Sequence, residues 1–97
     1  MPTYIQLVNY TQQGIEEIKR CPSRLDAAKE AFRAAGAEIK DFYLVLGRYD
    51  IVTVIEAPDG ETMAKLALAI GSLGDVRTET LRVFTEEEYR KIIAALP

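Results

Sequence analysis

Apolar and polar positions alternate along the first stretch of the chain, TYIQLVNYT (3–11), which is rich in β-branched and aromatic residues. Alternation of this kind places successive side chains on opposite sides of an extended strand. Ile5 and Leu7 fall on one side. The other side carries Tyr4, Gln6, Val8 and Tyr10. The pattern predicts a first strand.

In three later stretches apolar residues recur at three- and four-residue spacing, which is typical of amphipathic helices. We predict a helix from about Ser23 to Ala35, a second within 58–74 and a terminal one over 85–96. One short helical turn, GIEEIKR (14–20), precedes the first helix. The apolar stripes are Leu25, Ala28, Phe32 and Ala35, then Met63, Leu66, Ala67, Ile70 and Leu73, then Tyr89, Ile92, Ile93 and Leu96.

Residues that favour helix ends flank these stretches. Glycine adopts positive φ without strain, so Gly36 and Gly74 are expected to stop the first two helices. The residues expected at helix starts are Pro22, Asp59 or Gly60, and Thr85 with Glu88 in capping-box spacing.

Two runs dense in β-branched and aromatic residues, 37–47 and 48–57, predict a second and a third strand that are joined tightly at Gly47-Arg48. A fourth strand is predicted over 75–84. The order β-α-β-β-α-β-α contains two similar β-α-β halves, the pattern of the ferredoxin-like fold. We therefore expect an α+β fold: a four-stranded antiparallel sheet, two helices on one face and an extra C-terminal helix.

In such a fold helices cover only one face of the sheet, yet the third strand is apolar on both faces. Ile51, Thr53 and Ile55 lie on one face. Val52 and Val54 lie on the other. Strands of this kind are usually buried on both faces, and a monomer would expose a large apolar patch. We expect a second copy of the chain to cover the open face, in a homodimer or higher homo-oligomer, although the terminal helix could cover part of it.

The fourth strand differs, because it is polar on both faces. Its polar residues are Arg77, Thr78, Glu79, Thr80 and Arg82. An edge strand protected by charge explains this pattern. A polar pocket wall between the sheet and a partner explains it as well, and both interpretations stay open.

Composition narrows the class of protein. The 97 residues suffice for a single domain, 1–97, and 48% of them are apolar. With 12 basic and 15 acidic residues the net charge is −3, which argues against binding along a nucleic-acid backbone. The single cysteine, Cys21, cannot form an internal disulfide. A leader pattern and an apolar run of roughly 18 residues are both missing, so we expect a cytoplasmic protein that does not contact membranes.

The common catalytic and cofactor-binding motifs are also missing. The chain has no histidine, and one cysteine cannot build a zinc site. It has neither a GxGxxG nor a Walker-type glycine loop. We therefore expect neither a metal nor a cofactor.

Four residues interrupt the apolar run between the second and third strands: Gly47, Arg48, Tyr49 and Asp50. Gly47 permits a tight turn, and Asp50 suits an Asx-type hydrogen bond to amides of the turn. Turn chemistry explains less well why Tyr49 precedes an acid at the mouth of the sheet, close to where Lys19 and Arg24 are expected. A structural turn and a polar site both remain open.

These residues form part of several blocks that run in order along the chain. The blocks are TQQG at 11–14, K..P.R at 19–24, LG.YD at 46–50, APD at 57–59 and LG.VRTETL at 73–81. Together they resemble the GYD-domain family, small proteins of bacteria and archaea, over nearly the whole length. The resemblance implies a ferredoxin-like subunit of the dimeric α/β-barrel type and leaves the activity open.

The polar residues of these blocks fall at strand and helix ends and form our candidate site: Thr11, Lys19, Arg24, Tyr49, Asp50, Arg77 and Glu79. We favour a homo-oligomeric binding or regulatory module that holds a small polar or anionic ligand. Lys19, Arg24 and Tyr49 would bind this ligand. Thr11 and Arg77 are further candidate ligand-binding residues.

Two alternatives belong to other classes. One is a cofactor-independent enzyme acting on a small organic substrate, with Asp50 or Glu79 as the base and Tyr49 as hydrogen-bond donor. That role needs a carboxylate with a raised pKa, which a nearby guanidinium would prevent. The other is a purely structural assembly subunit.

Overall fold

The computed structural model describes residues 1–97, and its helices and strands follow the predicted order. The elements are β1 (Thr3–Tyr10), α1 (Gln12–Glu16), the 3₁₀ turn η1 (Ile18–Arg20), α2 (Cys21–Ala34), β2 (Glu38–Leu44), β3 (Ile51–Glu56), α3 (Gly60–Ser72), β4 (Val76–Val83) and α4 (Glu86–Ala94).

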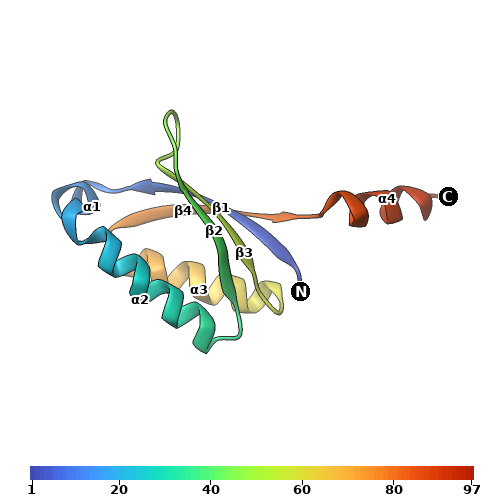
Figure 1. Ribbon diagram of the computed structural model, residues 1–97, viewed down its shortest axis with the longest axis horizontal. Coiled ribbons are helices and arrows are strands. Elements are labelled where there is room, and N and C mark those ends of the chain that lie inside the picture. The colour runs from blue at the N-terminus through green and yellow to red at the C-terminus, as the bar shows by residue number, and fades with distance from the viewer.

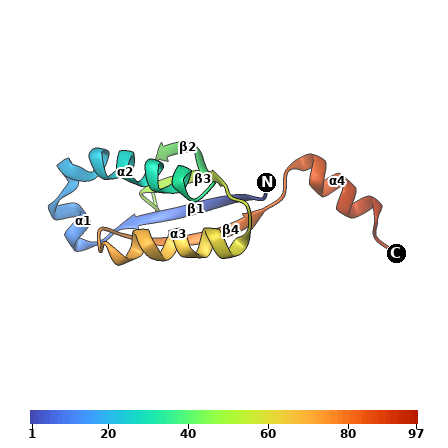
Figure 2. The ribbon, with the colours of Figure 1, turned by 90° about the horizontal axis from the view of Figure 1, so that it is seen from below.

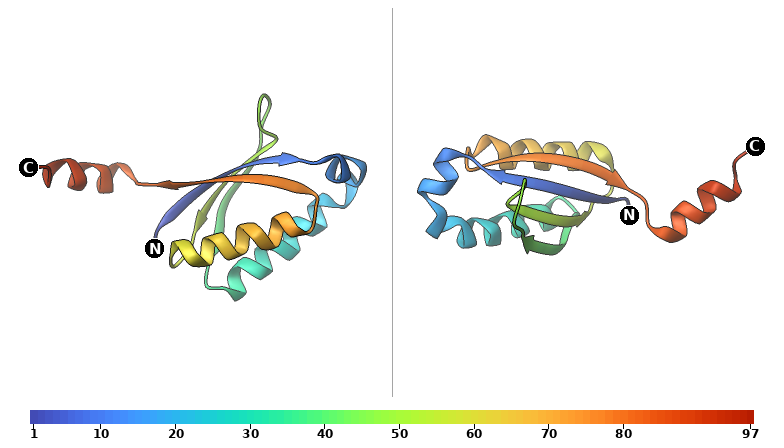
Figure 3. Two further views of the ribbon diagram at one scale, coloured as in Figure 1. Left: turned by 180° about the vertical axis from the view of Figure 1, so that it is seen from behind. Right: turned by 90° about the horizontal axis from the view of Figure 1, so that it is seen from above.

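The four strands form one antiparallel sheet with the order β2-β3-β1-β4, so β4 lies at an edge as predicted. Helices α2 and α3 lie side by side on one face of this sheet, as Figures 1 and 3 show from opposite sides. Figure 2 shows the same two helices in front of the strands. The chain therefore has the predicted α+β, ferredoxin-like βαββαβ fold with an added C-terminal helix.

Local signals set most of the helix ends. The side chain of Asp59 caps α3 by accepting a hydrogen bond from the backbone N–H of Thr62 at 2.8 Å. Thr85 and Glu88 form the predicted capping box of α4. Gly36 follows α2 with a φ of 83°, a left-handed conformation that glycine adopts without strain. Helix α2 begins at Cys21, two residues before the predicted start, because it directly continues the turn η1.

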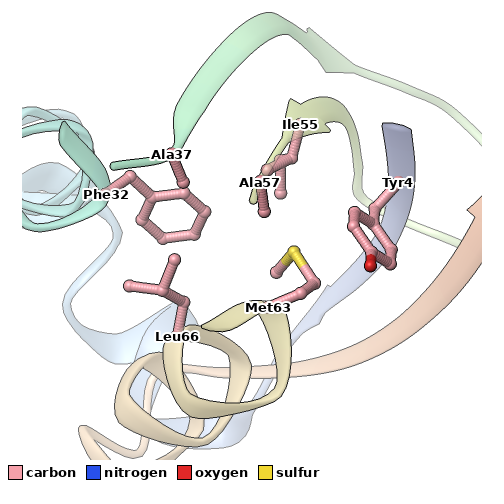
Figure 4. Close-up of a cluster of buried hydrophobic side chains, with 7 residues drawn as sticks. All are labelled: Tyr4, Phe32, Ala37, Ile55, Ala57, Met63 and Leu66. Atoms are coloured by element: carbon pink, nitrogen blue, oxygen red, sulfur yellow. The ribbon is translucent and has the colours of Figure 1, made fainter. Parts of the chain in front are cut away.

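The main hydrophobic core lies between the sheet, the C-terminal half of α2 and the N-terminal half of α3 (Figure 4). We call this cluster the packed end; its members are Tyr4, Phe32, Ala37, Ile55, Ala57, Met63 and Leu66. None of them exposes more than 8% of its surface. Burial of each large side chain here contributes about 1.5–3 kcal/mol to the free energy of unfolding.

The connection between β2 and β3 is longer than predicted. The expected tight joint at Gly47-Arg48 is wrong, because β2 ends at Leu44 and β3 begins at Ile51, which leaves a loop over 45–50 that extends beyond the sheet (Figure 1). The backbone N–H of Asp50 donates to the carbonyl of Val8 in β1 at 2.9 Å. This long-range bond holds the end of the loop against β1.

Helix α4 projects away from the rest of the subunit (Figures 1–3). The expectation that it could cover part of the open face is therefore wrong for this arrangement. Its apolar side chains are between 46% and 61% exposed. They are Tyr89, Ile92 and Ile93, together with Leu96 just beyond the end of the helix. None of the helices has the length and apolar character needed to cross a membrane.

Candidate functional site

The face of the sheet turned away from α2 and α3 is not covered by any element (Figure 3). We call it the bare face; its apolar residues are Ile5, Leu7, Tyr43, Val52, Val54 and Leu81. Strand register places them side by side: Ile5 lies opposite both Val54 in β3 and Leu81 in β4. The helix-covered residues of the same strands, such as Ile55, are buried instead. A contiguous apolar surface of this kind marks an interaction site.

A group of polar residues lies beside this apolar surface. The Tyr49 hydroxyl, from the loop between β2 and β3, donates to a carboxylate oxygen of Glu79 in β4 at 3.1 Å. Arg77 lies two residues before Glu79 and therefore on the same face of β4. We call these three residues the polar spot. The fold thus brings together three of the residues predicted from the sequence, from a loop and a strand that are distant in the chain.

Asp50 has a different environment from Tyr49, its neighbour in the chain. Its carboxylate accepts a hydrogen bond from the backbone N–H of Tyr10 at 2.9 Å. The predicted Asx-type bond within the turn is therefore wrong, because the Asp50 carboxylate accepts from the end of β1 and not from an amide of its own turn. Burial, together with the nearby Cys21 and Asp50, raises the pKa of the Tyr10 hydroxyl above its usual value.

The remaining predicted residues lie around α1 and the start of α2. Thr11 caps α1, because its hydroxyl accepts from the N–H of Gly14 at 3.1 Å and donates to the carbonyl of Gly74 at 2.5 Å. Thr11 also lines a shallow depression with Arg77. Lys19 is exposed on η1.

Arg24 in α2 forms ion pairs with two carboxylates. One is Glu17, at 2.7 Å, and the other is the buried Asp75. The structure therefore distributes the predicted residues among several places: the polar spot, the end of β1, and the region around α1. Lys19 and Arg24 do not join Tyr49 in one cluster within the subunit.

Two polar residues that the site prediction did not include lie under the helices. Gln6 and Thr53 are opposite each other in β1 and β3 and are only 3% and 5% exposed. The Gln6 amide donates to the Thr80 hydroxyl at 3.3 Å, whereas the Thr53 hydroxyl has no hydrogen-bond partner. The sequence carried a signal for them, because both polar residues alternate with apolar residues that face the helices: Gln6 lies between Tyr4 and Val8, and Thr53 between Ile51 and Ile55.

A four-stranded antiparallel sheet with the order β2-β3-β1-β4 and two helices on one face defines a ferredoxin-like fold. The family model of the GYD domain matches residues 4–93 of this chain. The chain belongs to the GYD-domain family, which confirms the resemblance drawn from its sequence blocks.

A named protein and a crystal structure, both from Thermus thermophilus, are similar to this chain. One, named "Glutamine synthetase and cystathionine beta-lyase binding protein", is 40% identical over 82 residues, which span 84% of this chain and 86% of the relative. The other is TTHA0845, whose crystal structure is known. It is 29% identical with a TM-score of 0.57 and aligns over 88% of this chain and 95% of its own.

Proposed function

We propose that this chain is a cytoplasmic, homo-oligomeric regulatory module that acts by binding a metabolic enzyme. The observation that carries the proposal is the apolar surface that its own fold leaves uncovered, which is the bare face together with the stripe of α4. A small polar or anionic ligand that modulates this binding would meet the polar spot, where Tyr49, Arg77 and Glu79 offer both donors and an acceptor.

Two separate surfaces support self-association. The bare face places Ile5, Leu7 and Val54 next to one another, and α4 presents Ile92 and Ile93 on an arm that extends from the subunit. Apolar surface in contact with water favours association by roughly 25 cal/mol per Å² buried. A symmetric dimer covers both copies of such a surface at once.

The similar Thermus thermophilus protein supports the choice of partner. Its name states that it binds glutamine synthetase and cystathionine beta-lyase, and it matches this chain over most of both lengths. An enzyme of amino-acid metabolism is therefore the partner class that we propose for this chain.

Native mass spectrometry and sedimentation velocity test the self-association. We expect a dimer or larger oligomer for the wild type, and a dissociation constant raised about tenfold or more in Ile92→Lys, because an unpaired ammonium resists burial. Ala94→Lys adds the same charge on the opposite side of α4 and is the matched control. A wild type that stays monomeric at every concentration overturns this part of the proposal.

Binding to the enzyme is tested separately, by biolayer interferometry with immobilised glutamine synthetase and cystathionine beta-lyase from the organism that encodes the chain. We expect saturable binding to one of them by the wild type and by Ala69→Lys on the exposed side of α3. Val54→Lys on the bare face should weaken it indirectly, because it breaks up the oligomer that binds the enzyme. An oligomer that binds neither enzyme contradicts the regulatory role and leaves the self-association intact.

One contact favours a second candidate, the cofactor-independent enzyme. The Tyr49 hydroxyl and a Glu79 carboxylate oxygen lie 3.1 Å apart, which is close enough for one small substrate to contact both groups in place of their present bond. If they are catalytic, Tyr49→Phe and Glu79→Gln should each lower turnover of a small organic substrate by about 100-fold. Equal turnover by both variants and the wild type would rule this candidate out.

A further inference from the structure

The layer between helices and sheet is not filled evenly. At the end opposite the packed end it contains a cavity of about 120 Å³, which we call the hollow end. Sixteen residues line it, and 11 of them are hydrophobic. They include Leu25 and Ala28 of α2, Ile70 of α3, and Val8 and Ile51 of the sheet. The cavity therefore lies between the helices and the sheet, on the side away from the bare face, and is partly open to solvent.

The side chains around the cavity explain why it is open. Helix α2 contributes the small residues Cys21 and Ala28, and Leu73 just beyond α3 is 66% exposed although its spacing predicts a core position. Protein interiors normally contain few voids larger than a water molecule. An apolar occupant would regain the dispersion contacts that the lining residues lack.

One polar group in the cavity wall is unusual. Thr53 is 5% exposed, and its hydroxyl oxygen has no hydrogen-bond partner. Gln6, its cross-strand neighbour, directs its amide to Thr80 instead. A buried polar group without a partner costs about 1–3 kcal/mol. Other protein atoms cover this oxygen in the present side-chain orientation. A ligand hydroxyl or carbonyl would remove the cost once the Thr53 side chain turns its hydroxyl toward the cavity.

The charges at the edge of the cavity compensate each other. Arg24 pairs with Asp75 and with Glu17 at 2.7 Å. Asp75 also accepts from the Gln13 amide at 3.0 Å. The Tyr10 hydroxyl is neutral at pH 7, as tyrosine ordinarily is, and burial raises its pKa further. The lining therefore offers hydrogen bonds without an uncompensated charge, which favours a neutral occupant.

We propose that the hollow end is a binding site for a small neutral molecule, largely apolar, whose hydroxyl or carbonyl group pairs with Thr53. An engineered cavity of about 150 Å³ in another protein binds benzene, so this smaller and partly open volume suits roughly five to seven non-hydrogen atoms. The site lies within one subunit and is independent of the proposed enzyme partner.

Phenol and toluene are suitable probes, because they share a ring and differ in the hydroxyl group. In methyl NMR titrations of the full chain we expect both to bind in the millimolar range or tighter, with shifts centred on Leu25, Ile51 and Ile70. Phenol should bind about 3- to 10-fold more tightly than toluene because it bonds to Thr53. Thr53→Val, which keeps the shape, should abolish that difference.

A filling variant locates the site. Ala28→Leu places three further carbons in the cavity and should abolish binding of both probes, whereas Ala69→Leu on the exposed side of α3 should bind them as the wild type does. Failure of the wild type to saturate with either probe overturns the proposal, and so does unchanged binding by Ala28→Leu. If Ala28→Leu does not fold, an unchanged phenol preference in Thr53→Val overturns it.

Discussion

The packed end and the hollow end are made from the same two helices and the same strands, yet different forces hold them. At the packed end, Phe32, Ile55 and Met63 are at most 2% exposed and interlock as side chains. At the hollow end polar contacts join the elements: the backbone N–H of Thr11 donates to the Asp75 carbonyl at 2.9 Å, and the side-chain amide of Gln13 donates to the carbonyl of Leu73 at 3.0 Å. One end supplies stability, and the other keeps its shape around a space.

The same substitution at the two ends should give the largest contrast. Phe32→Ala removes a fully buried ring from the packed end and should lower the free energy of unfolding by about 3–5 kcal/mol. Phe42→Ala removes a ring that is 37% exposed at the rim of the hollow end and should cost well under half as much. Urea denaturation followed by circular dichroism measures both, and equal losses would contradict the comparison.

A backbone variant tests how the hollow end is held. A Cβ at Gly14 would collide with the backbone carbonyl of Asp75. Because the collision is with the backbone, no side-chain rotation could relieve it. Gly14→Ala should therefore cost about 2–3 kcal/mol, as overpacking does, and should shift the NMR signals around Thr11.

Gly71→Ala is the matched control, because its Cβ would meet nothing within 4 Å. It lies in α3, so it should be neutral or slightly stabilising. A Gly14→Ala protein as stable as the control would show that this close approach is not required.

Added volume should have opposite consequences at the two ends. Ala57 is 0% exposed in the packed end, so Ala57→Leu forces its neighbours apart and should cost about 1–3 kcal/mol. Ala28→Leu extends into the cavity and should leave the thermal midpoint unchanged or raise it. Differential scanning calorimetry compares the two directly. A large loss in Ala28→Leu would mean that the hollow end is not available as space.

These contrasts also show which features the sequence could predict. Helix ends depend on contacts within a few residues, so Asp59, Thr85 and Gly36 were predicted correctly from spacing and residue type. The loop 45–50 was not, because its end is held by Asp50 bonding to β1, about 40 residues away in the chain. For the same reason, the sequence did not indicate that Arg24 pairs with Asp75.

The candidate site was predicted less completely than the fold. Tyr49 and Glu79 were named as single residues, and only the order of the strands brings them together. The cavity was missed because it is the space left open by the small side chain of Ala28 and by Leu73, which points outward. Residue type alone does not report an unfilled space.

The smallest expected effect is a loss of stability at acidic pH. The hydrogen bond from the Thr62 backbone lowers the pKa of Asp59, which caps α3 at the packed end, whereas α2 starts at Cys21 without a side-chain cap. Because the pKa of Asp59 is lower in the folded state, its ionised carboxylate stabilises the folded protein at pH values above the unfolded-state pKa, which is near 4. This stabilisation is lost as the pH falls through the folded-state pKa.

The stability of the wild type should therefore fall modestly more than that of Asp59→Asn below about pH 4, because asparagine keeps the cap without titrating. Chemical denaturation at several pH values measures the difference. Parallel curves for the two proteins would contradict the assignment of this cap.

Helix α4 has nine residues and no neighbour within its own subunit. Isolated helices shorter than roughly 12–15 residues are marginal in water, so we expect this arm to fray when it is free and to become ordered when it binds. Backbone amide exchange over 86–94 would then report occupancy directly: fast exchange counts solitary subunits, and slow exchange counts engaged ones.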